Sequence, residues 1–177
     1  MAFHDTYVEV MLPADKIQAR IAELGAQITK DYQGKELTLV GIMKGSIFFL
    51  TDLARHVDLP ITLELMGVSS YQGGTETTGE VRITNDLAKP MHGRHVIIVE
   101  DIIDTGLTMK FLLENLGARH PASVKVATLL EKPSRAKVKV PIDYKGFVIE
   151  DRFVVGYGLD YGEKYRNLPF VGVMRTD

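Results

Sequence analysis

The stretch that most constrains the fold is RHVIIVEDIIDTGLTMKFLLENLG, at residues 94–117. Its first part, 94–101, is apolar throughout its middle, which is typical of a strand buried on both faces of a parallel sheet. A glycine-containing turn, DTGLT, follows, and a helical pattern then runs over 107–117 and ends at a glycine, a common residue at helix ends. The stretch therefore predicts a strand–turn–helix unit whose turn lies at the carboxyl end of the strand, where α/β folds bind ligands.

The rest of the chain alternates between helical and strand patterns. An amphipathic helix is expected over 14–32, because apolar residues recur every three or four positions at Ile17, Ile21, Leu24 and Ile28. A second helix is expected to end at Val57, with Ser46 as its N-cap residue. Further strands are expected at 36–42, 61–70, 81–86 and 123–133, followed by short strand-like pieces. This order predicts an α/β fold: an open, mostly parallel, twisted sheet flanked by helices, with a small β-rich lobe.

No linker or repeat divides the 177 residues, so we expect a single domain over 1–177. The small lobe would be built from the N-terminal segment and from the part after about residue 133. Lys plus Arg total 21 and Asp plus Glu 23, and the resulting net charge of −2 gives no reason to expect a nucleic-acid or anionic-membrane surface. Cysteine is absent, no apolar run approaches the ~20 residues of a membrane span, and the N-terminus has no signal-peptide pattern. A cytoplasmic protein is the simplest interpretation.

The DTGLT turn has the features of a phosphate-binding loop. Backbone N–H groups at a helix start are unpaired and carry partial positive charge, and a turn with glycine lets several of them converge on one anion. Thr105 and Thr108 would add hydroxyl donors. The competing interpretation is an ordinary strand–helix junction with threonine as a cap.

The carboxylates beside the turn need a different partner, because they repel phosphate. For Glu100 and Asp101 we consider sugar hydroxyls, which donate to ionised carboxylates, and Mg²⁺, which binds oxygen ligands and bridges to substrate phosphates. A ligand with a phosphate, a ribose and a second phosphate group would satisfy the turn and the carboxylates together. The alternative without a ligand is an acidic pair that is simply exposed to water at the end of a strand.

The segment VIIVEDIIDTGLT resembles the phosphoribosyl-pyrophosphate signature of the type I phosphoribosyltransferases. From about Tyr7 to Val173 the chain resembles the 6-oxopurine branch of that family, which includes bacterial enzymes acting on hypoxanthine. The resemblance implies that Glu100 and Asp101 hold the ribose hydroxyls, with a Mg²⁺ ion nearby, and that Asp104 is the general base at N7 of the purine. It also implies that the 5′-phosphate is held by Asp104, Thr105, Gly106, Leu107 and Thr108.

The segment GIMKGS, at 41–46, would be the pyrophosphate loop of the resembled family, with Lys44 and Gly45 as ligands and a cis peptide between Met43 and Lys44. Its Lys-Gly-Ser order differs from the Gly-Lys-Ser of a Walker loop, which excludes an ATPase of that class. From the residues alone, Lys44 is better explained as a solvated loop lysine.

The segment SSYQGGTETTGEVRI, at 69–83, resembles the lid of the family, with Ser70 and Tyr71 at its hinge. A lid suits the implied chemistry, because the oxocarbenium-like sugar would otherwise react with water. From composition alone, the same segment is a surface hairpin.

The purine site of the resembled family maps onto two later segments. Lys132, in LLEKPSRA, would donate to O6 of the base, and Phe153 would stack on it. The backbone of Val154 would read N1 and the 2-position, Asp160 would bind a second Mg²⁺ beside the purine, and Arg166 would bind pyrophosphate. From the residues alone, Lys132 would be a surface charge, and Phe153 and Val154 would pack in the core.

The resemblance implies a purine salvage enzyme, a homodimer or homotetramer, that transfers the 5-phosphoribosyl group from phosphoribosyl pyrophosphate (PRPP) to N9 of hypoxanthine or guanine. The products would be IMP or GMP and pyrophosphate. Two alternatives remain: an RNA-binding regulator with the same fold, and a transferase for another base such as xanthine, adenine, uracil or orotate. The near-neutral composition disfavours the regulator, and Lys132 disfavours the adenine and pyrimidine enzymes.

Overall fold

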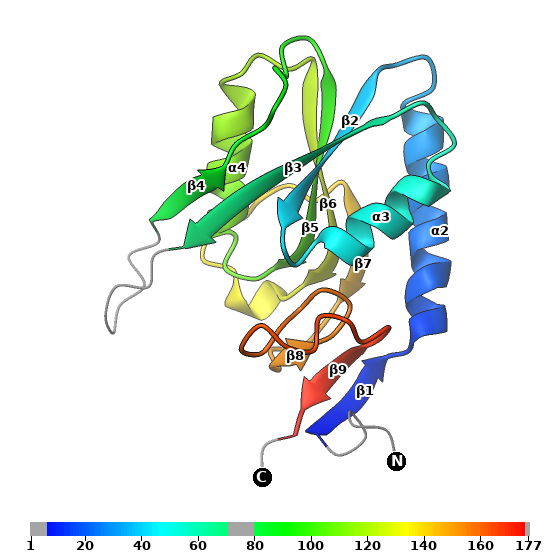
Figure 1. Ribbon diagram of the computed structural model, residues 1–177, viewed down its shortest axis with the longest axis vertical. Helices are drawn as coiled ribbons and strands as arrows, with labels where there is room; N and C mark the ends of the chain where they lie inside the picture. Colours follow the sequence, from blue (N-terminus) through cyan, green and yellow to red (C-terminus); the bar gives the residue numbers. More distant parts are fainter. Residues whose placement is uncertain (1–6, 71–79, 176–177) are drawn as a thin grey trace.

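The computed structural model describes residues 7–70 and 80–175, which form two sheets and the helices around them (Figure 1). The larger sheet has six strands in the order β4-β3-β2-β5-β6-β7. All neighbouring strands are parallel except β3 and β4, which are antiparallel. The strands are β2 (Leu37–Met43), β3 (Thr62–Ser70), β4 (Val81–Asn85), β5 (His95–Ile103), β6 (Ser123–Glu131) and β7 (Tyr144–Val148). The predicted open, mostly parallel sheet is confirmed.

Helices cover both faces of this sheet, which explains why its central strands have no polar side. The helices α2 (Ala14–Asp31) and α3 (Ile47–His56) lie on one face, and α4 (Leu107–Gly117) lies on the other (Figure 1). Successive strand residues point to opposite faces, so Leu39 joins the core under α2 and α3, while Val40 joins the core under α4. Each fully buried aliphatic side chain of this kind contributes about 1.5–3 kcal/mol.

The smaller sheet is antiparallel, in the order β1-β9-β8, and lies beyond the carboxyl ends of β2 and β5 (Figure 1). It consists of β1 (Val8–Leu12), β8 (Val154–Val155) and β9 (Val171–Met174). We expected the small lobe to begin at about residue 133, but β7 pairs with β6 in the large sheet. The reason is burial: Tyr144 lies in the main core opposite Ala127. The second part of the small sheet therefore begins only at β8.

Two local details differ from the sequence-based expectation. Ser46 does not cap α3 with its side chain; its hydroxyl instead donates to the carbonyl of Ile42 at 2.7 Å. Its backbone is already helical (φ −80°, ψ −3°), which removes the extended conformation that a side-chain cap requires. The strand β1 was not predicted, because the strand with which it pairs, β9, lies at the other end of the chain. Within 7–70 and 80–175, no helix has the length and apolar character needed to cross a membrane.

Candidate active site

The predicted phosphate loop connects β5 to α4 through Gly106, whose φ is +83°. A Cβ at this position would collide with the carbonyl oxygen of Val138, so the close approach requires glycine. The loop is fixed from the other side, because the carbonyl of Thr105 accepts hydrogen bonds from the N–H groups of Lys137 (2.9 Å) and Val138 (3.2 Å). The N-cap residue Gly106 has no side chain to cap α4, and the hydroxyl of Thr105 accepts only a long hydrogen bond (3.4 Å) from the N–H of Leu107, so the first turn can still bind an anion.

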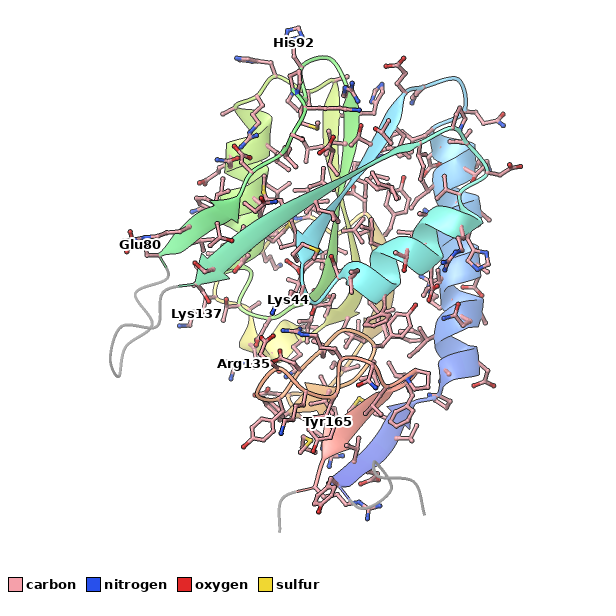
Figure 2. The ribbon with its side chains drawn as sticks, in the orientation of Figure 1. Lys44, Glu80, His92, Arg135, Lys137 and Tyr165 are labelled. Carbon is pink, nitrogen blue, oxygen red and sulfur yellow. The ribbon has the colours of Figure 1, made fainter. Side chains whose placement is uncertain are left out.

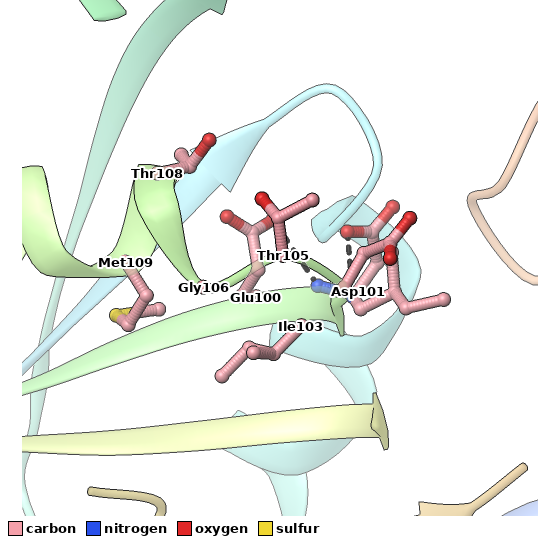
Figure 3. A pocket seen from close by; sticks show the side chains of 9 residues that line it. Glu100, Asp101, Ile103, Thr105, Gly106, Thr108 and Met109 are labelled. Carbon is pink, nitrogen blue, oxygen red and sulfur yellow. Dashed lines mark hydrogen bonds between the residues drawn. The ribbon is translucent and has the colours of Figure 1, made fainter. Parts of the chain in front are cut away.

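A cavity of about 190 Å³ opens at this loop, between the end of β5 and the start of α4 (Figure 3). It is lined by Glu100, Asp101, Ile102, Ile103, Asp104, Thr105, Gly106, Thr108 and Met109. The lining includes every residue that the sequence assigned to the ribose and the 5′-phosphate, with the exception of Leu107. One strand end and one helix start thus present acidic groups and anion-binding groups to a single space.

The acidic pair in this cavity is electrostatically unfavourable without a ligand. Burial, followed by repulsion from Asp101, raises the pKa of Glu100 well above its usual range. Burial also raises the pKa of Asp101, although hydrogen bonds from neighbouring groups, among them the N–H of Ile102 at 2.7 Å, and the charge of Arg166 limit the shift. Two carboxylates in one poorly hydrated site favour a shared proton, or a partner that supplies hydrogen-bond donors or positive charge.

This pair fits a Mg²⁺ ion that is shared with a substrate. No group of three or more metal-ligating side chains occurs in the part of the chain that the structure describes, so a site made wholly of protein ligands is not present there. Mg²⁺ usually takes one or two carboxylates and completes its shell with water and substrate phosphates. Glu100 and Asp101 supply that number.

The predicted pyrophosphate loop joins β2 to α3, and the Met43–Lys44 peptide is cis. Gly45 lies between two other parts of the site. A Cβ on Gly45 would collide with the carboxylate of Asp101, and a Cβ on Gly158 (φ +101°) would collide with the carbonyl of Gly45. The three chain segments therefore pack so closely that there is no room for a Cβ at Gly45 or Gly158, which explains glycine at both positions.

The two predicted pyrophosphate cations share one carboxylate. Lys44, at the carboxyl end of β2 (Figure 2), places its Nζ 2.6 Å from Oε2 of Glu163. Arg166 places Nη2 3.1 Å from Oε1 of the same Glu163 and 3.2 Å from Oδ1 of Asp160. The hydrogen bonds and charges of Lys44 and Arg166 hold the pKa of Glu163 below its usual range. Sequence reasoning did not single out Glu163, because nothing in its local pattern connects it to Lys44.

A second cavity, of about 120 Å³, adjoins the first and shares Ile103 and Asp104 with it. Lys132 lines this second cavity and is only 7% exposed, so the surface-charge interpretation of Lys132 is wrong. Its Nζ lies 3.5 Å from Oδ1 of Asp151. Asp104 and Lys132 thus border one continuous region, although they come from different loops.

Arg135 is a charged neighbour of Asp104 that the sequence did not reveal. Arg135 is labelled in Figure 2; its Nε donates to Oδ1 of Asp104 at 2.7 Å, and its Nη1 lies 3.6 Å from Oδ2 of Asp151. The short 3₁₀ turn at Pro133–Arg135 brings it there. The sequence offered one signal for a contact between Arg135 and the site, namely that Arg135 follows Lys132 by three residues.

Phe153 and Val154 have different environments. Phe153 is 55% exposed, packs edge-to-face against Tyr161 with ring centroids 5.7 Å apart, and lines a cavity of about 280 Å³. Val154 is buried in β8. Core packing therefore describes the side chain of Val154 but not that of Phe153, whose ring is available to stack on a ligand.

The predicted lid can be followed only at its ends. Ser70 is the last residue of β3 and pairs with Val81 of β4, so the two strands form the expected antiparallel pair. Tyr71 and the rest of 71–79 lie outside the described residues.

Comparisons with known proteins agree with this geometry. The family model described as the phosphoribosyl transferase domain matches residues 11–162. A hypoxanthine-guanine phosphoribosyltransferase from Staphylococcus aureus is 49% identical over 174 residues, covering 98% of this chain and 97% of that protein. A hypoxanthine phosphoribosyltransferase from Salmonella typhimurium is 52% identical over 167 residues, covering 93% and 94%. A crystal structure of a hypoxanthine phosphoribosyltransferase from Staphylococcus aureus is similar with a TM-score of 0.93 and 49% identity, covering 97% of this chain and 94% of that one.

Proposed function

The chain belongs to the phosphoribosyltransferase family, and we propose that it transfers the 5-phosphoribosyl group of PRPP to N9 of a 6-oxopurine, namely hypoxanthine and also guanine. The products are IMP or GMP and pyrophosphate, which makes the protein a purine salvage enzyme. The bases follow from the relatives that are about half identical over nearly the whole chain.

The observation that carries this proposal is the position of Asp104. It borders the cavity that holds the anion-binding turn and the acidic pair, and it also borders the adjoining cavity that holds Lys132. A sugar phosphate in the first cavity and a purine in the second would meet beside this carboxylate. That is the place where a base must act on the purine as the sugar is transferred.

The first cavity accounts for the binding of the sugar phosphate. We assign the 5′-phosphate to the turn and the first residues of α4, where N–H groups and threonine hydroxyls are donors. Glu100 and Asp101 would accept hydrogen bonds from the ribose hydroxyls, which relieves the repulsion between the two carboxylates.

The second cavity and β8 account for the choice of base. The ammonium of Lys132 has only donors, so it pairs with a 6-oxo group and not with the 6-amino group of adenine. Phe153 would stack on the purine, and the backbone of Val154 would read N1 and the 2-position. The partial exposure of the Phe153 ring supports this assignment.

In the transfer step, N9 of the purine forms a bond to C1 of the ribose while the bond from C1 to the pyrophosphate oxygen breaks. The bonding electron pair leaves with pyrophosphate. Asp104 accepts the proton from N7, which keeps the product base neutral. Lys44, Gly45 and Arg166 would bind the departing pyrophosphate, whose accumulating charge is the main electrostatic demand of the reaction.

We propose Mg²⁺ as the cofactor, held by Glu100 and Asp101, with Asp160 as ligand of a second ion. Bound there, Mg²⁺ neutralises phosphate charge. Asp160 already forms an ion pair with Arg166 and accepts a hydrogen bond from the N–H of Glu163, but a carboxylate has about four lone-pair positions and retains capacity for a cation. Ser70 and Tyr71 remain the proposed hinge of a lid that excludes water.

We also propose that the chain is a single domain and assembles into a homo-oligomer, a dimer or tetramer. The supporting observation is a set of exposed apolar side chains on α3, which directly follows the pyrophosphate loop, and on β3, which pairs with β2: Ile47, Phe48, Leu63 and Leu65. Apolar groups gathered in this way commonly mark a contact with another protein surface.

The test of the function is a set of initial rates with hypoxanthine, guanine, xanthine and adenine at saturating PRPP and Mg²⁺. We expect hypoxanthine and guanine to react and adenine to react at least about a hundredfold more slowly, because an unpaired donor is left at Lys132. Absence of transfer to any purine, together with salt-sensitive retention of RNA on a filter, would instead support the regulator.

A further inference from the structure

We propose that Glu163 sets the affinity of the site for pyrophosphate, by pairing with Lys44 and Arg166 in the free enzyme and competing with the product for them. This inference deepens the proposed function and rests on it. Glu163 touches neither of the two cavities assigned to the sugar phosphate and the purine, so its effect is confined to the pyrophosphate side of the site.

The contacts of Glu163 are those that two oxygens of a phosphate group would make. Its Oε2 lies 2.6 Å from Nζ of Lys44, and its Oε1 lies 3.1 Å from Nη2 of Arg166. One carboxylate therefore bridges a cation from the loop after β2 and a cation from the loop after β8. Pyrophosphate must displace these contacts to bind the same two groups.

The backbone holds Glu163 in this position. Its φ is +66°, and its N–H donates to Oδ2 of Asp160 at 2.9 Å, within a turn closed by hydrogen bonds between Tyr161 and Lys164. The turn directs the side chain back toward Arg166, three residues later. The carboxylate is tethered to the site, which gives it a high effective concentration there.

Arg166 has unused capacity to bind an anion. Its Nη1 donates to the carbonyl of Gly158 at 2.7 Å, and its Nη2 contacts Asp160 and Glu163. Its Nε is buried and has no hydrogen-bond partner among the described residues. A guanidinium binds phosphate best through two parallel N–H groups, and Glu163 occupies Nη2 in the free enzyme, so phosphate must replace Glu163 there to gain such a pair.

The charges balance before any substrate binds. Lys44 and Arg166 contribute two positive charges, and Asp160 and Glu163 contribute two negative ones. When pyrophosphate binds, Glu163 is released from the cations and repels the product. When pyrophosphate leaves, Glu163 pairs with them again. The carboxylate thus weakens the binding of a product, and product release limits turnover in many enzymes.

The test is direct calorimetric titration of inorganic pyrophosphate, at a fixed Mg²⁺ concentration, into wild type, Glu163→Gln and Glu163→Asp. For Glu163→Gln we expect binding about three- to tenfold tighter, because the exposed ion pair with Lys44 and the partly buried one with Arg166 no longer compete. Glu163→Asp keeps the charge but is too short to bridge both cations, so its affinity should fall between the other two. The gain should appear mainly as a slower dissociation of pyrophosphate in stopped-flow measurements.

Glu23→Gln is the matched control. Glu23 forms an ion pair of the same length with Arg20, 2.6 Å, and its side chain is 66% exposed, compared with 64% for Glu163. Glu23 lies on α2, away from the site, so the affinity of the Glu23→Gln variant for pyrophosphate should equal that of the wild type.

Unchanged or weaker pyrophosphate binding by Glu163→Gln would overturn the inference, since a residue that merely positions Lys44 and Arg166 weakens binding when it is removed. If Glu163→Gln fails to fold, Glu163→Asp decides on the same criterion: affinity equal to or below that of the wild type overturns the inference. Failure of the proposed function is recognised separately, as a wild-type protein that transfers no phosphoribosyl group to any purine.

Discussion

Arg135 donates its Nε–H to Oδ1 of Asp104 at 2.7 Å, so a guanidinium holds the carboxylate proposed as the general base. The pairing raises the pKa of Arg135, first through the hydrogen bond with Asp104 and then through its charge. Both side chains are partly exposed, so the pair contributes little to stability. The consequence that we propose for the reaction is orientation: one oxygen of Asp104 is fixed, and the other, which accepts no hydrogen bond from the residues that the structure describes, would face N7 of the purine.

A double-mutant cycle tests this orientation. Asp104→Asn should lower kcat about 10²–10⁴-fold, because the proton acceptor is lost, while the affinity for PRPP stays near that of the wild type. Arg135→Gln should lower kcat by a smaller factor, about tenfold, and should have almost no further effect when added to Asp104→Asn. If the two losses simply multiply, Arg135 does not act through Asp104.

The acidic pair should destabilise the ligand-free protein as the pH rises. Because the pKa of Glu100 in the folded protein is raised above its usual 4.5, its protonated form is favoured by folding. That stabilisation is fully present below about pH 4.5 and is lost as the pH rises through the folded pKa. We therefore expect Glu100→Gln to melt at the same temperature as the wild type near pH 4, and to melt higher at pH 8.

Thermal melts without Mg²⁺ or nucleotide measure this difference, where each kcal/mol corresponds to about 2–4 °C for a chain of this size. The exposed Glu36→Gln is the control and should not shift the melting temperature with pH. The same Glu100→Gln variant should bind PRPP and IMP less tightly, because it loses a charged acceptor for the ribose hydroxyls. A variant that melts no higher than wild type at pH 8 would show that the pair is not under electrostatic strain.

Gly158 should be far less tolerant of alanine than Gly162, although both have positive φ, +101° and +57°. A Cβ on Gly158 meets the carbonyl of Gly45, whereas a Cβ on Gly162 meets no atom of the described residues within 4 Å, its two chain neighbours aside. Gly162→Ala should cost only the ~1–2 kcal/mol of a left-handed backbone. Gly158→Ala should cost more and should raise the KM for PRPP, because it displaces the pyrophosphate loop. Equal KM values for the two variants would contradict the contact.

The apolar surface on α3 and β3 should be the oligomer contact. Leu63→Lys and Leu65→Lys introduce charges on side chains that are 49% and 41% exposed, so they should convert an oligomer to monomers when measured by light scattering after gel filtration. Val148→Lys is the control, since Val148 is 60% exposed but lies on β7, outside that surface. A wild-type protein that is monomeric at micromolar concentration would contradict the assignment.

The residues alone predicted the elements that depend on local periodicity and turn chemistry. The helix expected over 14–32 is α2 (Ala14–Asp31), and the strand expected over 94–101 overlaps the central strand β5 (His95–Ile103). The helix start after Gly106 was predicted with its correct last residue, Gly117. These predictions succeeded because a spacing of three to four residues, or an unbroken apolar run, reports burial on one or both faces of an element.

The sequence by itself thus determined the α/β fold and the family and predicted an anion-binding turn, since these depend on the order of the elements and on motifs within single segments. Only the tertiary structure decided that Lys132 is buried, that Arg135 holds Asp104, and that Glu163 bridges Lys44 and Arg166. The physical reason is that ion pairs between distant segments follow from where loops meet at the end of a sheet. A charged residue has the same local pattern whether it faces water or an opposite charge more than a hundred residues away.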